Sequence, residues 1–313
     1  MSRTVRPPEV DAPTSSLASE RTATGRSIAL MLLATLVLST MHVLVRHTSA
    51  GIHPFEIAFF RNLLGLLFLL PLLLRFGLAA VRSQQPWLQV LRGAIGAASM
   101  MAWFYGLSVV PLAEATTLSF IGVVFSSIFA VLFLREPMRA RRWAAIGVNL
   151  IGTLIVLRPG YTDLSVGVLA VLFSAVTWGA GVVLVKHLSR VDSPICTVTW
   201  MSFTLSALSL PPALAVWTWP TPEQFVFLAL IALLATFGHL AFAKALQLAD
   251  ATLLMPLDFL RLVWAGLAGY LLFAEVPDLW SLIGGTLIVA SAIYITRRQR
   301  LTRSAAVRSD EPN

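Results

Sequence analysis

The chain has 313 residues, of which 57% are hydrophobic and 12% carry a formal charge, and its mean hydropathy is +0.81. A soluble chain of this length has about twice that charged fraction, so the composition argues against a soluble globular protein. The net charge of +8 lies mostly in the terminal segments and short loops, where basic residues set membrane topology and do not indicate nucleic-acid binding.

Long stretches without Asp, Glu, Lys or Arg recur along the chain. They are 93–113, 115–134, 164–185, 194–222 and 279–296. Each is close to the ~20 residues that a helix needs to cross a bilayer core of about 30 Å. None alternates polar and apolar residues as the strands of a membrane barrel do. The sequence therefore predicts an all-α polytopic membrane protein.

Ten transmembrane helices are expected, joined by segments that contain Pro or Gly. In chain order they span 27–48, 54–75, 86–109, 112–134, 141–158, 165–188, 194–216, 223–247, 250–273 and 277–297. Residues 1–26 are rich in Arg, Pro, Ser, Thr and Ala and precede the first apolar run, so we expect a disordered cytoplasmic tail. Residues 298–313 have the same character and are expected to form a second cytoplasmic tail.

The two halves of the chain repeat the same short patterns in register. The pairs are "VLVRHTSAGIHP" (43–54) with "VLVKHLSRVDSP" (183–194), "LAEAT" (112–116) with "LADAT" (248–252), and "WAAIG" (143–147) with "WSLIG" (280–284). Each half, 27–160 and 161–297, holds five expected helices, and an odd number makes the second half enter the membrane from the opposite side. The sequence thus predicts an inverted repeat, which supplies alternating access around a site near the midplane. A channel or a purely architectural duplication is the alternative.

Basic residues decide the expected orientation. If the N-terminus is cytoplasmic, nearly all Arg and Lys residues near the span ends fall on the cytoplasmic side, while Arg46 and Arg158 fall outside. Both termini are therefore expected in the cytoplasm. The single cysteine, Cys196, permits no disulfide within the chain.

Four stretches resemble the EamA-type branch of the drug/metabolite transporter superfamily. They are "HPFEIAFFRNLLGLL" (53–67), "WFYGLSVVPLAEATTLSF" (103–120), "LREPMRARRWAAIGVNLIGTLIVLRPG" (134–160) and "LADATLLMPLDFLRLVWAGLAGYLLFAE" (248–275). The resemblance implies a bacterial inner-membrane carrier whose first four helices and sixth to ninth helices surround a central cavity. The fifth and tenth helices would lie at the periphery, as braces or dimer contacts. Where the family commonly has a proline after "LSF", this chain has Ile121.

Asp258 and Arg261 are the clearest candidates for substrate binding or coupling. They lie about 12 and 16 Å along the ninth expected helix, near the middle of the bilayer, and their i, i+3 spacing lets them pair. Ionisable groups at that depth cost several kcal/mol unless they are paired or hydrated. The alternative is a self-neutralising structural pair. Their first-half counterparts are Gly122 and Phe125, which favours binding on one side of the site.

Arg61 and Asn62 form a second candidate group, roughly 10 Å into the second expected helix. A guanidinium there can bind a carboxylate, a phosphate or the edge of a planar ring. The alternative is an arginine that pairs with Glu56 or with a backbone carbonyl. The counterpart of Arg61 in the second half is Met201, so this charge is not repeated either.

Two histidines and three aromatic residues complete the candidate site. His239 and His42 are expected to titrate or to donate to substrate, or else to be packing histidines. Trp103, Tyr105 and Phe259 are candidates for stacking on a flat ring, although most aromatic residues in such a bundle pack against one another.

Four further acids are assigned to structure. Glu114 and Asp250 lie just inside helix starts, where a carboxylate interacts favourably with the helix dipole. Glu136 and Glu275 lie at helix ends and are expected to be structural.

These patterns favour a secondary transporter. The chain has no HExxH, no GxSxG and no metal-spaced cluster, so no enzyme activity, metal or cofactor is expected, and no ATP site is visible. Riboflavin uptake is the first expectation, because a planar polar metabolite fits aromatic residues with Arg and Asp. S-adenosylmethionine, amino acids or drugs, in either direction, are the alternative, and a membrane-embedded enzyme or channel is less favoured. The expected partners are a small-molecule substrate, the lipid bilayer and a second copy in a homodimer, with no nucleic acid.

Overall fold

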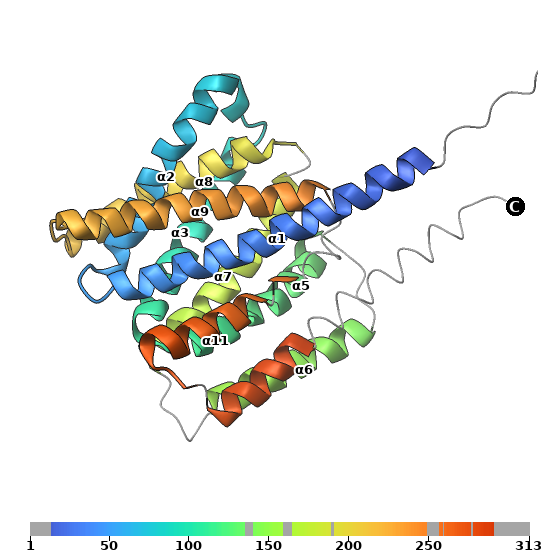
Figure 1. Cartoon of the computed structure of the whole chain (residues 1–313), viewed down its shortest axis with the longest axis vertical. Helices are drawn as coiled ribbons and strands as arrows, with labels where there is room; N and C mark the ends of the chain where they lie inside the picture. The colour runs from blue at the N-terminus through green and yellow to red at the C-terminus, as the bar shows by residue number, and fades with distance from the viewer. Residues whose placement is uncertain are drawn as a thin grey trace, which may run out of the picture.

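The computed structural model describes residues 14–134, 140–158, 165–188, 191–248, 257–258, 260–276 and 278–290, and these ranges contain helices and no strand (Figure 1). In chain order the elements are α1 (Thr14–Thr48), α2 (Pro54–Phe76), the 3-10 helix η1 (Leu78–Val81), α3 (Pro86–Val109), α4 (Leu112–Ser119), α5 (Ile121–Leu134), α6 (Ala140–Leu157), α7 (Val166–Leu188), α8 (Pro194–Ala215), α9 (Pro222–Leu248), α11 (Leu260–Phe273) and a final helix, Leu279–Ala290. The expected all-α class is confirmed.

Several helices are suited to a bilayer by length and composition. Five segments of the described chain are long and apolar enough to cross it: Gly25–Thr48, Pro54–Arg75, Val166–Val185, Ile195–Ala215 and Pro222–Phe242. Large apolar side chains such as Leu74, Leu132 and Leu271 are exposed on the outside of the bundle, where a soluble protein would place polar residues. The fold is that of a polytopic membrane protein.

The loops gather at two opposite ends of the bundle. The end at which α1 passes into α2 is called here the α1–α2 end, and the end at which α2 passes into α3 is the α2–α3 end. At the α1–α2 end, Gly167 near the start of α7 packs against Val109 at the end of α3. At the α2–α3 end, Asp192 follows α7 and accepts a hydrogen bond from Ser83, which precedes α3. Thus α1 and α7, the first helices of the two halves, run in opposite directions, and the inverted repeat is confirmed.

Corresponding helices of the two halves also pack alike. Helix α1 lies along α9 and α3 lies along α7, which are equivalent pairs under the repeat, and α2 packs against its own counterpart α8. Helix α6 and the final helix Leu279–Ala290 lie side by side at the edge of the bundle (Figure 1), where Gly152 and Gly284 bring their backbones together. As the resemblance implied, the fifth and tenth helices are peripheral.

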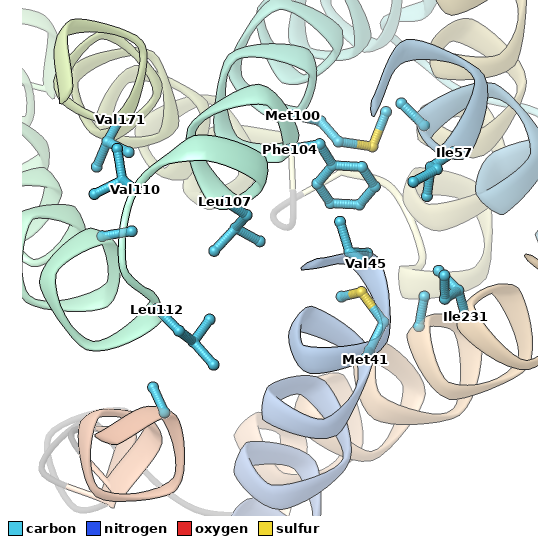
Figure 2. Close-up of a cluster of buried hydrophobic side chains, with 14 of the residues drawn as sticks. Met41, Val45, Ile57, Met100, Phe104, Leu107, Val110, Leu112, Val171 and Ile231 are labelled. Atoms are coloured by element: carbon cyan, nitrogen blue, oxygen red, sulfur yellow. The ribbon is translucent and has the colours of Figure 1, made fainter. Parts of the chain in front are cut away.

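An apolar cluster fills the bundle toward its α1–α2 end (Figure 2). It is built from Met41, Val45, Ile57, Met100, Phe104, Leu107, Leu112 and Ile231, which come from α1, α2, α3, α4 and α9. Phe104 and Leu107 are at most 2% exposed, so this region excludes water. The bundle is therefore closed at the α1–α2 end by packed side chains.

The N-terminal helix is longer than predicted. Helix α1 begins at Thr14 instead of Ser27, so the expected disordered tail is wrong for residues 14–26. The Leu, Ala, Glu and Arg residues of this stretch favour helix, and a helix that is already formed extends by one hydrogen bond per residue without a new nucleation cost. Residues 1–13 and 291–313, which include the predicted C-terminal tail, lie outside the described residues.

The fourth predicted helix is two helices. Helix α4 ends at Ser119 and α5 begins at Ile121, so the chain breaks at Phe120 although the family's usual proline is absent. The hydroxyls of Thr116, Thr117 and Ser119 donate to carbonyls of the preceding turn at 2.7, 2.8 and 2.7 Å. Such side-chain bonds compete with the helical ladder and bend helices. Hydrogen bonds from these hydroxyl groups to the backbone thus occur where the helix breaks.

Four exposed tryptophans mark the two ends. Trp87 and Trp143 begin α3 and α6 at the α2–α3 end, and they are 74% and 53% exposed. Trp219 lies in the α8–α9 loop and Trp280 begins the final helix, both at the α1–α2 end, and they are 85% and 49% exposed. Trp143 and Trp280 occupy matching positions of the repeat.

Candidate functional site

Two small pockets with polar side chains in their lining lie between the helices. The Arg261 pocket is formed by α1, α3, α4 and α11, and Ser39, His42, Trp103, Thr116 and Arg261 contribute to its lining. The Arg61 pocket is formed by α2, α8 and α9, and Arg61, Asn62, Met201, Ser202, Thr236 and His239 contribute to its lining. Their free volumes, ≈ 10 and ≈ 20 Å³, hold roughly one water each. In this conformation neither pocket has room for a metabolite, so one can bind there only if the helices move apart.

The predicted pair of charges is present in the Arg261 pocket region. Arg261 Nη2 lies 2.5 Å from Asp258 Oδ2, and the two side chains are 23% and 18% exposed. The guanidinium also lies over the ring of Phe120, with Cζ 5.8 Å from its centroid. Because Phe120 occupies the break between α4 and α5, that break brings a first-half aromatic ring onto a second-half charge. The Nε of Arg261 is buried without a hydrogen-bond partner.

A histidine and a tryptophan meet in the same pocket. Trp103 Nε1 donates to His42 Nε2 at 3.2 Å, and the rings meet edge to face with centroids 5.4 Å apart. Since the Nε2 lone pair accepts this bond, the imidazole is neutral and carries its proton on Nδ1. His42 therefore offers a donor to the pocket, while Trp103 is fixed by its own N–H.

The Arg61 pocket holds an arginine with weak partners. Arg61 is 8% exposed, and its Nη1 donates to Asn62 Oδ1 at 3.1 Å and to Met100 Sδ at 3.1 Å. Asn62 Nδ2 donates to the Ala58 carbonyl at 2.7 Å and to the same sulfur at 3.2 Å. The Nε of Arg61 is buried without a hydrogen-bond partner. A thioether is a weak acceptor, so most of the donor capacity of this guanidinium is unused.

The pairing of Arg61 with Glu56, one of the alternatives above, does not occur. Glu56 is fully buried and accepts hydrogen bonds from the backbone N–H and the hydroxyl of Thr218 at 3.2 and 3.3 Å. This carboxylate therefore ties α2 to the α8–α9 loop at the α1–α2 end. Nothing in that connection neutralises Arg61.

His239 joins Arg61 in its pocket. Its Nδ1 lies 2.8 Å from the Ala235 carbonyl and donates to it, which leaves Nε2 as an acceptor in the neutral ring. Arg61 from α2 and His239 from α9 thus line one pocket.

Arg92 was not predicted as a site residue. It lies about two turns inside α3, and its Nη1 is buried without a hydrogen-bond partner. The sequence contains a signal for this residue, because a charge two turns inside an apolar helix of a membrane protein usually faces the interior of the helix bundle.

Tyr105 is not brought to either described pocket. Tyr105 on α3 is half-buried and is not among the lining residues of either pocket. Phe259 lies outside the described residues. The aromatic rings that do meet the arginines are Phe104, below Arg61 with Cζ 6.0 Å from the centroid, and Phe120.

An ion pair closes the bundle beside the apolar cluster. Arg46 Nη2 lies 2.5 Å from Glu275 Oε1, and Arg46 Nη1 donates to the carbonyls of Leu107 and Val110 at 2.7 and 2.5 Å. Glu275 Oε2 accepts the backbone N–H of Leu112 at 2.7 Å. These bonds fasten the ends of α1, α3 and α11 to the start of α4. Glu275 therefore has a structural role in this conformation.

Comparison with known proteins identifies the family. The EamA-like transporter family matches this chain twice, over residues 25–158 and 165–297. This chain belongs to the EamA-like transporter family. The two matches fall on the two inverted halves, so each half of this EamA-like transporter is one copy of the family's repeat.

Named relatives of this EamA-like transporter are transporters of different solutes. An S-adenosylmethionine uptake transporter of Rickettsia conorii is 31% identical over 82% of this chain and 87% of its own length. A riboflavin transporter of Rhizobium johnstonii is 32% identical over 77% of this chain and 80% of its own length. A pseudopaline exporter of Pseudomonas aeruginosa is 29% identical over 87% of this chain and 96% of its own length.

A solved structure shares the fold of this EamA-like transporter. A crystal structure that is 20% identical aligns with 90% of this chain and 99% of its own, with a TM-score of 0.59. At that identity the likeness concerns the fold alone.

Proposed function

We propose that this EamA-like transporter carries a small organic metabolite across the bacterial inner membrane by alternating access, driven by a gradient and not by ATP. The observation that carries the proposal is the pair of inverted halves, closed at one end over buried arginines and histidines. Two similar halves can exchange conformations, so a state closed at the α1–α2 end implies a state closed at the other end. Both termini are proposed to lie in the cytoplasm, and a C-terminal reporter fusion tests that orientation.

Riboflavin and S-adenosylmethionine are the two candidate substrates, and uptake is the proposed direction. Riboflavin uptake is the expectation from the sequence, and Trp103 supports a flat ring near the Arg261 pocket. S-adenosylmethionine is supported by a separate observation, which is that Asp258, Arg61 and Arg261 place charges of both signs in the bundle. Riboflavin is uncharged at neutral pH, whereas S-adenosylmethionine carries a carboxylate, an ammonium and a sulfonium. The charges therefore favour S-adenosylmethionine.

Flux through purified protein tests the proposal. Proteoliposomes are loaded with riboflavin, S-adenosylmethionine or an amino-acid mixture, and uptake and efflux are measured with and without proton and sodium gradients. A transporter gives saturable flux for one class of solute. Flux that does not saturate would indicate a channel, and no flux for any solute under any gradient would overturn the proposal.

Arg61→Ala is the first variant to measure. Because Arg61 is bound to neutral partners, its removal leaves no carboxylate unpaired among the residues described, and the folded amount should stay near wild type. Transport should fall at equal protein amount. Wild-type flux would assign Arg61 to structure.

A further inference from the structure

The Arg61 pocket lies where the two halves of the chain face each other. Two neighbouring residues of α2 and their counterparts on α8 line it, namely Arg61, Asn62, Met201 and Ser202. A residue that shares a pocket with its own counterpart lies beside the axis that relates the two halves. Among the residues described at the Arg261 pocket, no two are counterparts. The Arg61 pocket is therefore the one of these two that lies on the axis.

A pocket on that axis has the position that a transport site needs. When two inverted halves exchange conformations, the axis between them keeps the same relation to both ends of the bundle. Transporters built from inverted repeats accordingly bind their substrates near the bilayer midplane, at the interface of the repeats. The Arg61 pocket is thus placed to open to each side in turn.

The α2 side of this pocket offers hydrogen-bond donors. Arg61 is 8% exposed, and its Nε is buried without a hydrogen-bond partner. Its Nη1 is held by Asn62 Oδ1 and by Met100 Sδ, both at 3.1 Å, and a thioether is a weak acceptor. The counterpart Met201 has no donor to offer. An acceptor atom of a ligand would gain a charge-assisted hydrogen bond on the Arg61 side of the pocket.

The α9 side of the same pocket offers an acceptor. His239 lines the pocket, and its Nδ1 lies 2.8 Å from the Ala235 carbonyl oxygen. Because a carbonyl oxygen only accepts, Nδ1 carries the proton and Nε2 of the neutral ring accepts. A ligand that matches both residues therefore needs an acceptor for Arg61 and a donor for His239. A carboxylate would match Arg61 alone, because an ionised carboxylate only accepts.

We propose that the Arg61 pocket binds the hydrogen-bonding edge of a planar heterocycle, with Arg61 donating to a ring oxygen or nitrogen and His239 Nε2 accepting an N–H group of the same edge. This inference rests on the proposed transport function and narrows its substrate class. Both candidate substrates have such an edge. The adenine ring of S-adenosylmethionine has an amino group beside a ring nitrogen, and the ring system of riboflavin has an N–H group between two carbonyls.

Methylated ligands test the inference on the purified full chain. Riboflavin is compared with riboflavin methylated at its ring N–H, and S-adenosylmethionine with its analogue dimethylated at the adenine amino group. Methylation removes the donor in each pair. Calorimetry should show the wild type binding the parent of one pair at least about tenfold tighter than its methylated form, equivalent to about 1.4 kcal/mol. Binding of neither parent, or equal affinity within the pair that binds, would overturn the inference.

Two variants separate the two contacts. His239→Phe keeps a ring but has no acceptor, so the preference for the parent should fall toward equal affinity. Arg61→Met copies the counterpart residue and should weaken parent and methylated ligand alike, by at least about tenfold. If the methyl groups act only by a clash, the preference survives in His239→Phe, because a phenyl ring is no smaller than an imidazole. That result, or wild-type affinities in Arg61→Met, would overturn the inference.

A matched control removes a different arginine. Arg82→Met makes the same substitution at an exposed residue just after η1 and should keep wild-type affinities. Size-exclusion profiles report the folded fraction of each variant, and the wild-type comparison decides the inference even if a variant does not fold. Saturable flux in a protein that does not distinguish methylated ligands would leave the proposed function standing while this inference fails. Discrimination between the ligands without flux of any solute would do the reverse.

Discussion

The two halves of the chain share an architecture and differ in their charges. Helix α1 packs on α9 as α3 packs on α7, yet Arg61 has Met201 as its counterpart and Asp258 has Gly122. Helix contacts depend on the size and spacing of side chains, so a duplicated sequence preserves them easily. A substrate needs one set of polar contacts, not two. The difference teaches that the helix packing is symmetric while the buried charges are not, as the proposed transport requires.

The same contrast appears in the loops that start α2 and α8. Both helices begin with a side-chain cap, from His53 and Ser193, followed by a proline. Before those caps stand Ile52 in the first half, 2% exposed, and Asp192 in the second. The α1–α2 end therefore uses an apolar residue where the α2–α3 end uses a carboxylate. The loops that lead into α2 and α8 are therefore built on different chemistry.

The largest effect is expected from Glu275→Gln, which weakens the closure at the α1–α2 end. Breaking an ion pair that shields Arg46 should cost up to about 3 kcal/mol of unfolding free energy, and less if water reaches the site. It should also expose a cysteine introduced at Ser39, in a Cys196→Ser background, to thiol reagents. Glu223→Gln, at an exposed acid in the first turn of α9, is the control. Equal thermal stability and equal thiol labelling in both variants would contradict the role of Glu275 in closing the α1–α2 end.

A smaller effect is expected where the peripheral helices touch. A Cβ on Gly284 would lie 2.5 Å from the Gly152 carbonyl oxygen and 2.5 Å from Val156 Cγ2, so Gly284→Ala must push the two helices apart. Overpacking of this kind costs about 1–3 kcal/mol. The repeat supplies the control, because Gly147 is the counterpart of Gly284 and has nothing within 4 Å of the added atom. Thermal unfolding should distinguish the two, and equal loss in Gly147→Ala would mean that helix contact is not the cause.

Asp258→Asn should cut transport at least about tenfold, a loss of about 1.4 kcal/mol, because the charge is carried by one half only. The amide keeps the size of the side chain and part of its hydrogen bonding, so the fold should persist. The double variant with Arg261→Gln removes any penalty from an unpaired guanidinium. If the double variant recovers both protein amount and transport, the pair is structural. Recovery of protein amount without transport supports binding or coupling.

The smallest effect is expected from Asp192→Asn, and it should depend on pH. Burial raises the pKa of Asp192, but hydrogen bonds from Ser83, the Gln84 N–H and Gln89 outweigh it, so the pKa lies below its ordinary value. The ionised carboxylate therefore stabilises the folded state at neutral pH. That contribution, about 1 kcal/mol, begins to decrease when the pH falls below the pKa of the unfolded state, near 4, and it is lost as the pH drops through the folded pKa.

Thermal unfolding of the wild type and Asp192→Asn across this pH range checks the prediction. The gap between them should be widest near pH 7 and should narrow in acid. A gap that is constant with pH would show that the hydrogen bonds of Asp192 do not depend on its charge.

Periodic and repeated features of the fold could be predicted from the sequence. Runs of apolar residues predicted the helices, and the repeated sequence patterns predicted the inverted halves. Both features can be recognised from residue types alone. The break at Phe120 was missed, since it accompanies hydroxyl bonds from Thr116, Thr117 and Ser119 that no apolar pattern reveals. The early start of α1 was missed because a polar stretch can be helical or disordered with the same composition.

The candidate site was predictable where two residues lie close together in the sequence. Asp258 and Arg261 pair at i, i+3, as their spacing indicates. Contacts between helices were not predictable, so the hydrogen bond from Arg61 to the sulfur of Met100 appears only in three dimensions. The hydrogen bonds of Glu56 were not predictable either, because its partner, Thr218, lies far away in the sequence.

The inverted repeat also fixes how the protein sits in its bilayer. Trp143 and Trp280 are one ancestral position expressed twice, and inversion places one copy at each end of the bundle, beside Trp87 and Trp219 respectively. Indole rings settle at the headgroup level on both faces of a membrane. A single duplicated residue thus contributes to both aromatic girdles. In the proposed transport cycle the halves would rock between two anchored surfaces, and the depth of the molecule in the membrane would stay constant while its opening changes sides.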